Sequence, residues 1–467
     1  MPDGMNGKSV KRLEDAELLV GEARYVDDIN PPGLLHASFV RSEFAHAKIK
    51  SIDKDSALNM PGVVAVFTLE QIMDVLTTDR VPATFPQPQP REEFGSYVLA
   101  HDEVCYVGEP LAMVIAESRY EAEDAAALVN VDYEPLDAMT DCRLAAQLDA
   151  PATDTRNKGN VFSSVSMGYG DCKSAFENAA NVISETLYQH RGVAMSMECR
   201  GLGSSFDKKR CKLTIWASCQ QPHGHKAILV DLLGLSEDQV RVIVPHLGGG
   251  FGPKLILYPE DASVSAASVK LGKPIKWIED RREHLLTTTQ ERDQVWEVEL
   301  AADKDGRLLG LRGKLYHDQG AYTVRGTNIP FSAATTILGP YILPNYQIDV
   351  SVVHTNKVPS TSMRGAGHPQ GNFTMERLID RMAEKVGMDP AEIRSLNLIP
   401  SDSIPYEQPL RTQAGQRIIY DGGDYSKCQE ELMQTLDYSG FAVRQQRAKS
   451  EGRFIGMAMA NYVKPTG

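Results

Sequence analysis

Residues 246–254 are the stretch of this sequence best suited to hold a charged ligand. They read HLGGGFGPK, and four of the five residues from 248 to 252 are glycine. Because glycine lacks a Cβ atom, the backbone N–H groups of such a loop can approach a large ligand that carries anionic or oxo groups. A tight turn without a ligand explains a lone glycine-rich loop equally well. The loop therefore needs partners elsewhere in the chain.

This glycine loop does not fit the common nucleotide-binding patterns. Lys254 follows Pro253 and precedes Leu255, so the loop lacks the Lys-Ser or Lys-Thr ending of a Walker A motif. No helix-opening pattern follows it directly, which argues against a dinucleotide-binding fold. Another class of ligand is expected.

Two further segments offer polar groups of the right kind. Residues 216–223 place Gln220 at the junction of a predicted strand and helix, and an amide there can bind an oxo group or a water. Residues 362–370 place Arg364 beside a second glycine-rich turn, where its fixed fork of donors suits an oxyanion. Taken singly, each could be an ordinary turn residue. Their joint presence favours one binding site.

The elements that must position these groups are strands that lead into loops and helices that follow them. Apolar residues predict a strand at 240–244 before the glycine loop and a strand at 213–216 before Gln220. They also predict a hairpin of 296–301 with 308–316. Two helices, at 223–233 and 370–386, are expected to end at Gly234 and Gly387. Strands and helices are interleaved without a strict βαβα rhythm, which predicts an α+β fold.

The N-terminal third predicts a smaller unit. A strand over 104–116, broken by Gly108-Glu109-Pro110, precedes a helix capped by Ser118, and 129–133 is the expected return strand of a compact β-α-β unit. The polar segment 141–160 is typical of a linker. We therefore predict two domains, residues 1–150 and 151–467.

Composition excludes several classes of protein. The chain has 467 residues and a formal net charge of −13, which gives no support to nucleic-acid binding. No apolar run approaches the roughly 18 residues of a membrane span, and the N-terminus has no secretory h-region. The seven cysteines are scattered without a C-x-x-C, which excludes a zinc ribbon or an iron–sulfur site of ordinary spacing. A reducing cytoplasmic location is expected.

Four stretches together resemble one known family. They are RSEFAHA at 41–47, VGEP at 107–110, GGGFGPK at 248–254 and RGAGHPQ at 364–370. The chain resembles the molybdenum-binding large subunit of the molybdenum hydroxylases, the xanthine oxidase and aldehyde oxidase family. Residues 197–201 also resemble a family segment, although Cys199 stands where the family usually has proline. The resemblance implies an α/β hammerhead domain over 1–150, followed by the first molybdopterin-binding domain over 151–467.

The resemblance also implies a role for each polar group. In this family the molybdenum is held by the dithiolene of a pterin and by no protein side chain. Gln220 matches the amide that hydrogen-bonds the apical oxo ligand. The residues that match the family's loop beside the metal and pterin are Gly249, Gly250, Phe251, Gly252, Arg364, Gly365 and Ala366. The implied reaction inserts an oxygen derived from water into a C–H bond.

The sequence departs from the family pattern after its first half. Relatives usually continue with a second molybdopterin-binding half that carries the catalytic glutamate, and no matching motif occurs here; Glu109 lies in the hammerhead part. We expect either a fragment or a split large subunit, as in nicotinate dehydrogenase-like enzymes. The general base would then lie on a second molybdopterin-binding subunit, and [2Fe–2S] and FAD on further partners. The pterin is expected in its cytosine dinucleotide form.

The substrate class is indicated by residues that specialised members of the family have and this chain lacks. Gly365 stands where carbon monoxide dehydrogenases have cysteine, and Leu255 where purine-specific relatives have glutamate. Ser332 occupies the place of a purine-binding arginine, and Ala366 that of a stacking aromatic ring. A pocket lined by Leu255, Ser332 and Ala366 favours a pyridine-like N-heteroaromatic substrate or an aldehyde. The alternative is a non-catalytic scaffold or assembly subunit that keeps the fold.

Residues 453–463 place large apolar side chains on both faces of a presumed strand. This run predicts a strand that is buried on both faces and pairs with a partner polypeptide.

Overall fold

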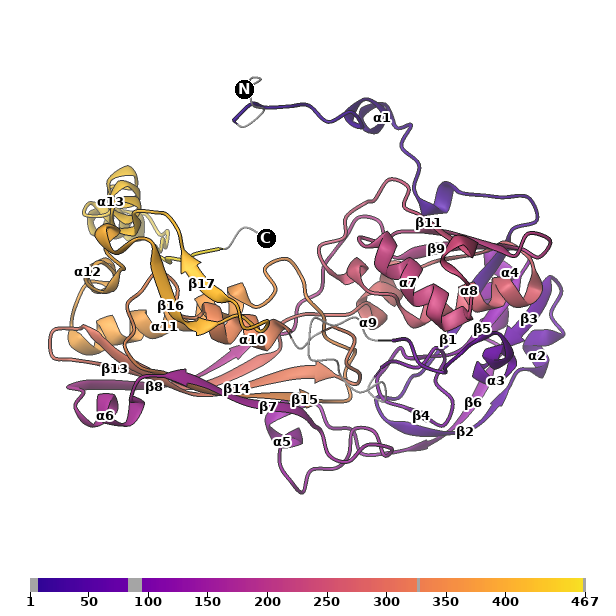
Figure 1. The fold of residues 1–467 in the computed structure, drawn as a ribbon, viewed down its shortest axis with the longest axis horizontal. Coiled ribbons are helices and arrows are strands. Elements are labelled where there is room, and N and C mark those ends of the chain that lie inside the picture. The colour runs from indigo at the N-terminus through magenta and orange to yellow at the C-terminus, as the bar shows by residue number, and fades with distance from the viewer. Residues whose placement is uncertain (1–6, 83–94, 326–327, 465–467) are drawn as a thin grey trace.

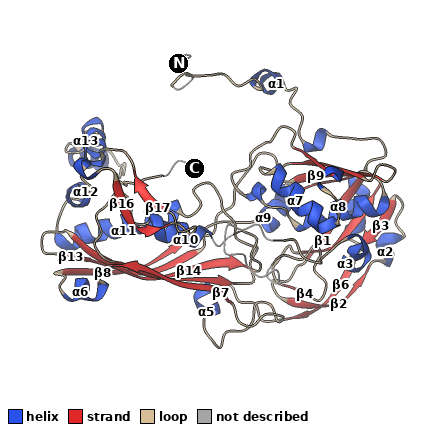
Figure 2. Ribbon diagram, in the orientation of Figure 1, coloured by secondary structure: helices blue, strands red, loops and turns tan. Residues whose placement is uncertain are grey.

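The computed structural model describes residues 7–82, 95–325 and 328–464. Two sheets organise the molecule and lie side by side, each with helices packed on it (Figure 1). Figure 2 shows that strands and helices are mixed in both halves, so the predicted α+β class is confirmed. Among the described residues, no helix is long and apolar enough to cross a membrane.

The first sheet has seven strands in the order β11-β10-β9-β12-β1-β5-β3. Their bounds are Val240–Ile243, Lys212–Ala217, Gly201–Asp207, Ile275–Ile278, Leu35–Arg41, Pro110–Ala116 and Val63–Phe67. The apolar β5 is buried along its whole length, because Met113 and Ile115 face the core under α7 (Pro222–Leu233) and α8 (Pro259–Leu271), while Val114 faces the helix α4 (Arg119–Ala126).

This sheet combines strands from both sides of residue 150. The parallel pair β1 and β12 aligns Leu35 with Ile275 and so joins the N-terminal strands to the rest of the sheet. The domain boundary near residue 150 stays a prediction.

A small sheet corrects the predicted β-α-β unit. Ser118 caps α4 as expected, since its Oγ accepts the N–H of Glu121. The strand after the helix, β6 (Asn130–Pro135), does not return to β5 but pairs with β2 (Ala47–Asp53), which also pairs with β4 (Glu103–Val104). Ile52, Val131 and Tyr133 pack against a separate core cluster, and burial of these side chains decides which sheet the strand joins.

The second sheet has five strands in the order β7-β15-β14-β13-β8. Their bounds are Val161–Tyr169, Tyr346–His354, Leu308–Gly320, Gln294–Ala302 and Asn181–Gln189. The predicted hairpin is present as β13 and β14. Helices α10 (Asn328–Thr336) and α11 (His368–Val386) pack on the sheet around Trp296, Leu315 and Met382.

The remaining elements are short. They are α1 Asp15–Val20, α2 Asp55–Leu58, α3 Leu69–Ile72, α5 Cys142–Ala145, α6 Cys172–Glu177, α9 Arg281–Thr287, α12 Pro390–Asn397, β16 Tyr406–Arg411, β17 Arg417–Tyr420, α13 Tyr425–Thr435 and α14 Phe441–Ser450. The expected linker 141–160 is wrong in part, because it contains α5 and a buried Asn160 that accepts from the Thr153 N–H. The predicted loop at 82–95 lies almost entirely outside the described residues.

The predicted C-terminal strand is not formed within the described chain, and its pairing with a partner polypeptide stays a prediction. Residues 453–464 form no strand, and Phe454 and Tyr462 are 86% and 70% exposed. Side chains such as Ile455 and Met457 are half-buried on the opposite side. The physical reason is that, in the described part of the chain, no neighbouring strand supplies a ladder for this backbone.

Candidate functional site

The three predicted segments meet around the glycine loop. Gln220 follows β10, and its backbone N–H donates to the Lys254 carbonyl at 2.8 Å. The N–H of Gly252 donates in turn to Oε1 of Gln220 at 2.8 Å. On the other side, the N–H of Arg364 donates to the Phe251 carbonyl at 2.8 Å. The loop is therefore held between the Gln220 amide and the arginine turn.

Two glycines of the loop allow this approach. A Cβ atom on Gly250 would lie 2.4 Å from Cδ of Gln220. Gly252 has a φ of 119°, and a Cβ there would lie 2.0 Å from the carbonyl oxygen of Ser362. Neither position can take a side chain without displacing its neighbour, so the glycine-rich pattern is explained by close packing of the segments that form the site.

Non-glycine backbone strain gathers in the same place. Of the six non-glycine residues with positive φ in the described chain, Phe251 (58°) and Ala366 (44°) lie in the two loops. Such residues persist only where the surrounding structure holds them, and they occur preferentially at functional sites. The guanidinium carbon of Arg364 lies 5.2 Å from the centre of the Phe251 ring, and both side chains are exposed. The site thus presents a ring and a cation to an incoming group.

A buried lysine ties the loop to its support. Nζ of Lys254 donates to Oγ of Ser218 at 2.7 Å and lies 3.3 Å from Oε2 of Glu198. The same carboxylate accepts the N–H of Gly248 at 2.9 Å. Burial lowers the pKa of Lys254, while Glu198 acts in the opposite direction. The sequence analysis missed Glu198, although it lies in the family segment at 197–201.

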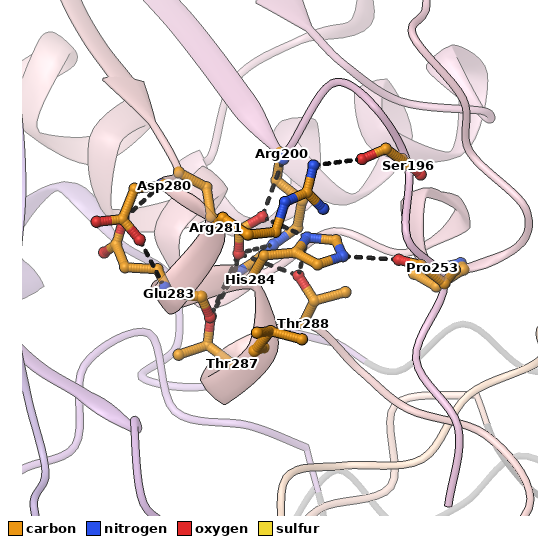
Figure 3. A network of polar contacts seen from close by, with 12 residues as sticks. Ser196, Arg200, Pro253, Asp280, Arg281, Glu283, His284, Thr287 and Thr288 are labelled. Carbon is orange, nitrogen blue, oxygen red and sulfur yellow. Dashed lines mark hydrogen bonds and ion pairs between the residues drawn. The ribbon is translucent and has the colours of Figure 1, made fainter.

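A network of buried ion pairs and hydrogen bonds surrounds Arg200, two residues after Glu198 in the sequence (Figure 3). Arg200 is 4% exposed, and its Nε donates to Oε1 of Glu279 at 2.8 Å. Burial acts to raise the pKa of Glu279, but the Arg200 guanidinium beside it brings the pKa well below its usual range. On α9, Arg281 donates to the Ser196 carbonyl at 2.6 Å and Nε2 of His284 lies 2.7 Å from the Ala194 carbonyl. These contacts fix the segment that carries Glu198.

Two of the three residues predicted to line the substrate pocket are brought near each other by the packing of α10 on the arginine turn. A Cβ on Gly367 would lie 2.8 Å from Cβ of Ser332, so α10 packs on the turn that carries Ala366. Oγ of Ser362 also donates to Oδ1 of Asn328 at the start of α10. Leu255 is half-buried just after the glycine loop. A pocket shared by all three stays a prediction.

The donor set fits a pterin-bound oxo metal centre. Oε1 of Gln220 accepts the N–H of Gly252, so the Nε2 end of the amide is left as a donor for a ligand. Backbone at 249–252 has no Cβ wall except Phe251, and the Arg364 guanidinium is exposed beside it. An amide donor, a bare backbone and a cation are what a bulky, negatively charged cofactor needs.

Family models match both halves of the chain. Residues 20–137 match the hammerhead domain of aldehyde oxidase and xanthine dehydrogenase, and residues 153–398 match the molybdopterin cofactor-binding domain. The large subunit of nicotine 6-hydroxylase from Paenarthrobacter nicotinovorans is 36% identical over 465 residues, which are 99% of this chain and 56% of that protein. The chain thus spans little more than half the length of this relative.

A solved structure and a second curated relative are also similar to this chain over most of its length. Quinoline 2-oxidoreductase from Pseudomonas putida 86 superposes with a TM-score of 0.87 at 34% identity, over 96% of this chain and 56% of that one. The nicotinate dehydrogenase large molybdopterin subunit of Eubacterium barkeri is 29% identical over 398 residues, which are 84% of this chain and 88% of that subunit. The chain therefore belongs to the aldehyde oxidase and xanthine dehydrogenase family of molybdopterin-binding proteins, and it carries the family's hammerhead domain followed by its molybdopterin cofactor-binding domain.

Proposed function

We propose that this chain is the molybdenum-cofactor-binding subunit of an oxidoreductase that hydroxylates a pyridine-like N-heteroaromatic substrate, or oxidises an aldehyde, with water as the oxygen source. The observation that carries the proposal is the pair of bonds around the glycine loop, Gly252 to Gln220 and Arg364 to Phe251. A scaffold without catalysis has no need of this arrangement.

When bound, the molybdenum cofactor supplies two-electron oxidation and the transfer of an oxygen that comes from water. The Nε2 group of Gln220 would donate to an oxo group of the cofactor, because Gly252 already holds the other end of the amide. The backbone of Phe251 and Gly252 would pack on the cofactor, and Arg364 would offset its negative charge. Preorganised donors of this kind are effective because they are already oriented before the reaction.

An uncharged aromatic substrate suits the residues around the arginine turn. Leu255, Ser332 and Ala366 carry no charge, and the exposed Phe251 ring offers an apolar surface. The relatives named for nicotine and quinoline support an N-heteroaromatic substrate over a purine.

The site is completed, in this proposal, by the region that longer relatives carry beyond the matched part. That region would supply the general base, a glutamate, and most contacts to the pterin, which we expect as its cytosine dinucleotide. The Eubacterium barkeri subunit, of which the match covers 88%, supports a separate molybdopterin subunit for it. Electrons would leave through [2Fe–2S] and FAD subunits.

The test is to purify the chain with the polypeptides that accompany it and to measure molybdenum, pterin and turnover. Quinoline, a nicotine-like pyridine and an aldehyde serve as substrates in water labelled with ¹⁸O. Molybdenum near one per complex and ¹⁸O in the product support the proposal. A complex without molybdenum, or one inactive on every substrate class, favours the scaffold alternative.

A further inference from the structure

A buried carboxyl group without a full partner lies beneath the arginine turn. Glu291 is 1% exposed, between α9 and β13, where its backbone forms a bridge with Gly192. Neither of its carboxyl oxygens makes a hydrogen bond of good geometry within the described residues. Carboxyl groups are rarely buried in this way without a reason, since unpaired burial is costly.

Apart from Arg292, the groups that face this carboxyl lie in the turn that presents Arg364 or in the first turn of α11, which follows it. Burial raises the pKa of Glu291. The groups that act against burial and lower this pKa are the Arg292 guanidinium, the Gln370 amide and the backbone N–H groups of Met363 and Gly367. Gln370 is fully buried, and neither polar atom of its amide makes a hydrogen bond of good geometry within the described chain. The N–H of Arg364 itself donates to the Phe251 carbonyl, in the glycine loop. Glu291 and the glycine loop therefore contact different backbone groups of the same turn.

The backbone is strained to place Glu291 there. The next two residues, Arg292 and Asp293, have φ values of 73° and 56°. Ion pairs hold this conformation, because Asp293 bonds Nε of Arg191 at 2.7 Å and Nζ of Lys357 at 2.9 Å. Consecutive left-handed residues outside glycine are unfavourable and persist where the surrounding structure enforces them.

A direct backbone link completes the connection. The N–H of Gln290 donates to the Pro359 carbonyl, and the N–H of Thr361 donates to the Gln290 carbonyl at 2.8 Å. The segment that carries Glu291 and the segment that leads into the arginine turn are thus paired side by side.

We propose that Glu291 is a positioning residue that sets the conformation of the turn from Met363 to Gly367 and, through it, the placement of Arg364 and Ala366. The inference deepens the proposed function and rests on it for what the turn does. It adds a group that touches neither cofactor nor substrate.

The carboxyl group has two ways to hold the turn. Burial raises its pKa to about 7, against the opposing effect of Arg292. As a neutral acid it can donate to Oε1 of Gln370, and as a carboxylate it can accept from the N–H groups of Met363 and Gly367. The other charged or titratable groups near the turn are Arg364 itself, which is exposed, and His368, whose Nδ1 lies 2.8 Å from the Gly365 carbonyl. The turn is therefore expected to differ slightly below and above neutral pH.

The first test needs no cofactor. Hydrogen exchange of the amides at 363–367 is measured in the full chain at pH 6 and pH 8, for Glu291→Gln, Glu291→Ala and the exposed control Glu430→Gln. Each rate is divided into the intrinsic rate at the same pH, so that the resulting protection factor excludes the base catalysis common to all amides. Relative to the control, Glu291→Ala is expected to speed exchange in the turn by about tenfold, the cost of one lost hydrogen bond. Glu291→Gln should remove the pH dependence of the protection factors in the turn. Unchanged exchange in Glu291→Gln at both pH values would overturn the proposal, and this holds even if the alanine variant fails to fold.

The second test uses the cofactor-loaded complex. Glu291→Gln should flatten the pH dependence of kcat near neutrality while molybdenum content and the pH dependence of the Glu430→Gln control stay unchanged. If exchange in the turn responds but no molybdenum is present, the proposed function fails and the positioning role stands. If the complex is active and neither exchange nor the pH profile responds, the positioning role fails alone.

Discussion

The backbone N–H of Gly252 donates a hydrogen bond to Oε1 of Gln220 at 2.8 Å, which fixes which end of that amide stays available. The loop can make this bond because Gly250 leaves room for the glutamine side chain, whose Cδ would be 2.4 Å from a Cβ at that position. Glycine loop and amide are therefore one unit, although about thirty residues separate them in the sequence.

The free end of the amide gives the first prediction. Gln220→Ala removes one preorganised donor, so turnover of the assembled enzyme should fall by about tenfold to a thousandfold. Molybdenum content should be retained, because the side chain holds no metal. The neighbouring exposed Gln221→Ala is the control. Full activity with normal molybdenum in Gln220→Ala would make Gln220 only a turn residue.

Packing at Gly252 gives the second prediction. Gly252→Ala places a Cβ 2.0 Å from the Ser362 carbonyl at a φ of 119°, so either the loop or the arginine turn must move. We expect a loss of about 2–4 kcal/mol in the free energy of unfolding, from strain and overpacking together. Gly422→Ala, where no atom lies within 4 Å, is the matched control in the same urea titration. Equal stability of the two variants would contradict the packing shown here.

Sequence reasoning found the parts of the site that carry a local pattern. The glycine run, Gln220 and Arg364 stand in recognisable motifs, and the structure brings these three together. Glu198 and Glu291 were missed because a single acid has no pattern of its own, and only long-range folding places it against Lys254 or Gln370. The pairing partner of β6 also depends on tertiary burial, since a strand that follows a helix is locally compatible with either sheet.

The ion network around Arg200 gives the third prediction. Arg200→Met leaves the buried carboxylate of Glu279 without its main counter-charge, and breaking such a pair costs about 3–5 kcal/mol. Arg200→Lys should rescue little, because a lysine cannot reach Glu279, Glu260 and Thr287 in one planar fork. Arg210→Met, at a position 82% exposed, is the control. The measurement is the urea midpoint of the full chain at pH 7.

The fourth prediction concerns pH and stability. Because burial raises the folded-state pKa of Glu291 from 4.5 to about 7, the unfolded chain releases its proton first as the pH rises. Ionisation of Glu291 therefore does not lower the free energy of unfolding below about pH 4.5. It lowers this free energy progressively between about pH 4.5 and pH 7, and by a constant amount on the order of 3 kcal/mol above that. Glu291→Gln should remove that cost, so its stability advantage over the native chain should grow from pH 5 to pH 8. Glu109, whose pKa burial also raises to about 7, is unchanged in both proteins and cancels in the comparison. A constant difference between the two proteins across this range would contradict the assignment.

The last prediction concerns the extended C-terminal segment at 453–464. Its backbone is without a strand ladder in the described chain, and its side chains alternate between half-buried and exposed positions. An extended segment that lacks a strand ladder and carries exposed rings is suited to pairing with another polypeptide. The rings of Phe454 and Tyr462 are exposed, so Phe454→Asp and Tyr462→Asp should change the stability of the isolated chain by less than about 0.5 kcal/mol.

Association should respond differently from stability. If the region that completes the site pairs along this segment, a charge at either ring position must be buried there, and binding should weaken by at least about tenfold. Tyr120→Asp, on α4 and 79% exposed, introduces the same charge far from the segment and is the control. The measurement is the dissociation constant of the complex with the complementary subunit, by titration of the purified components. Unaltered binding in both Asp variants would show that the partner region docks elsewhere on the molecule and that the extended segment takes no part in closing the site.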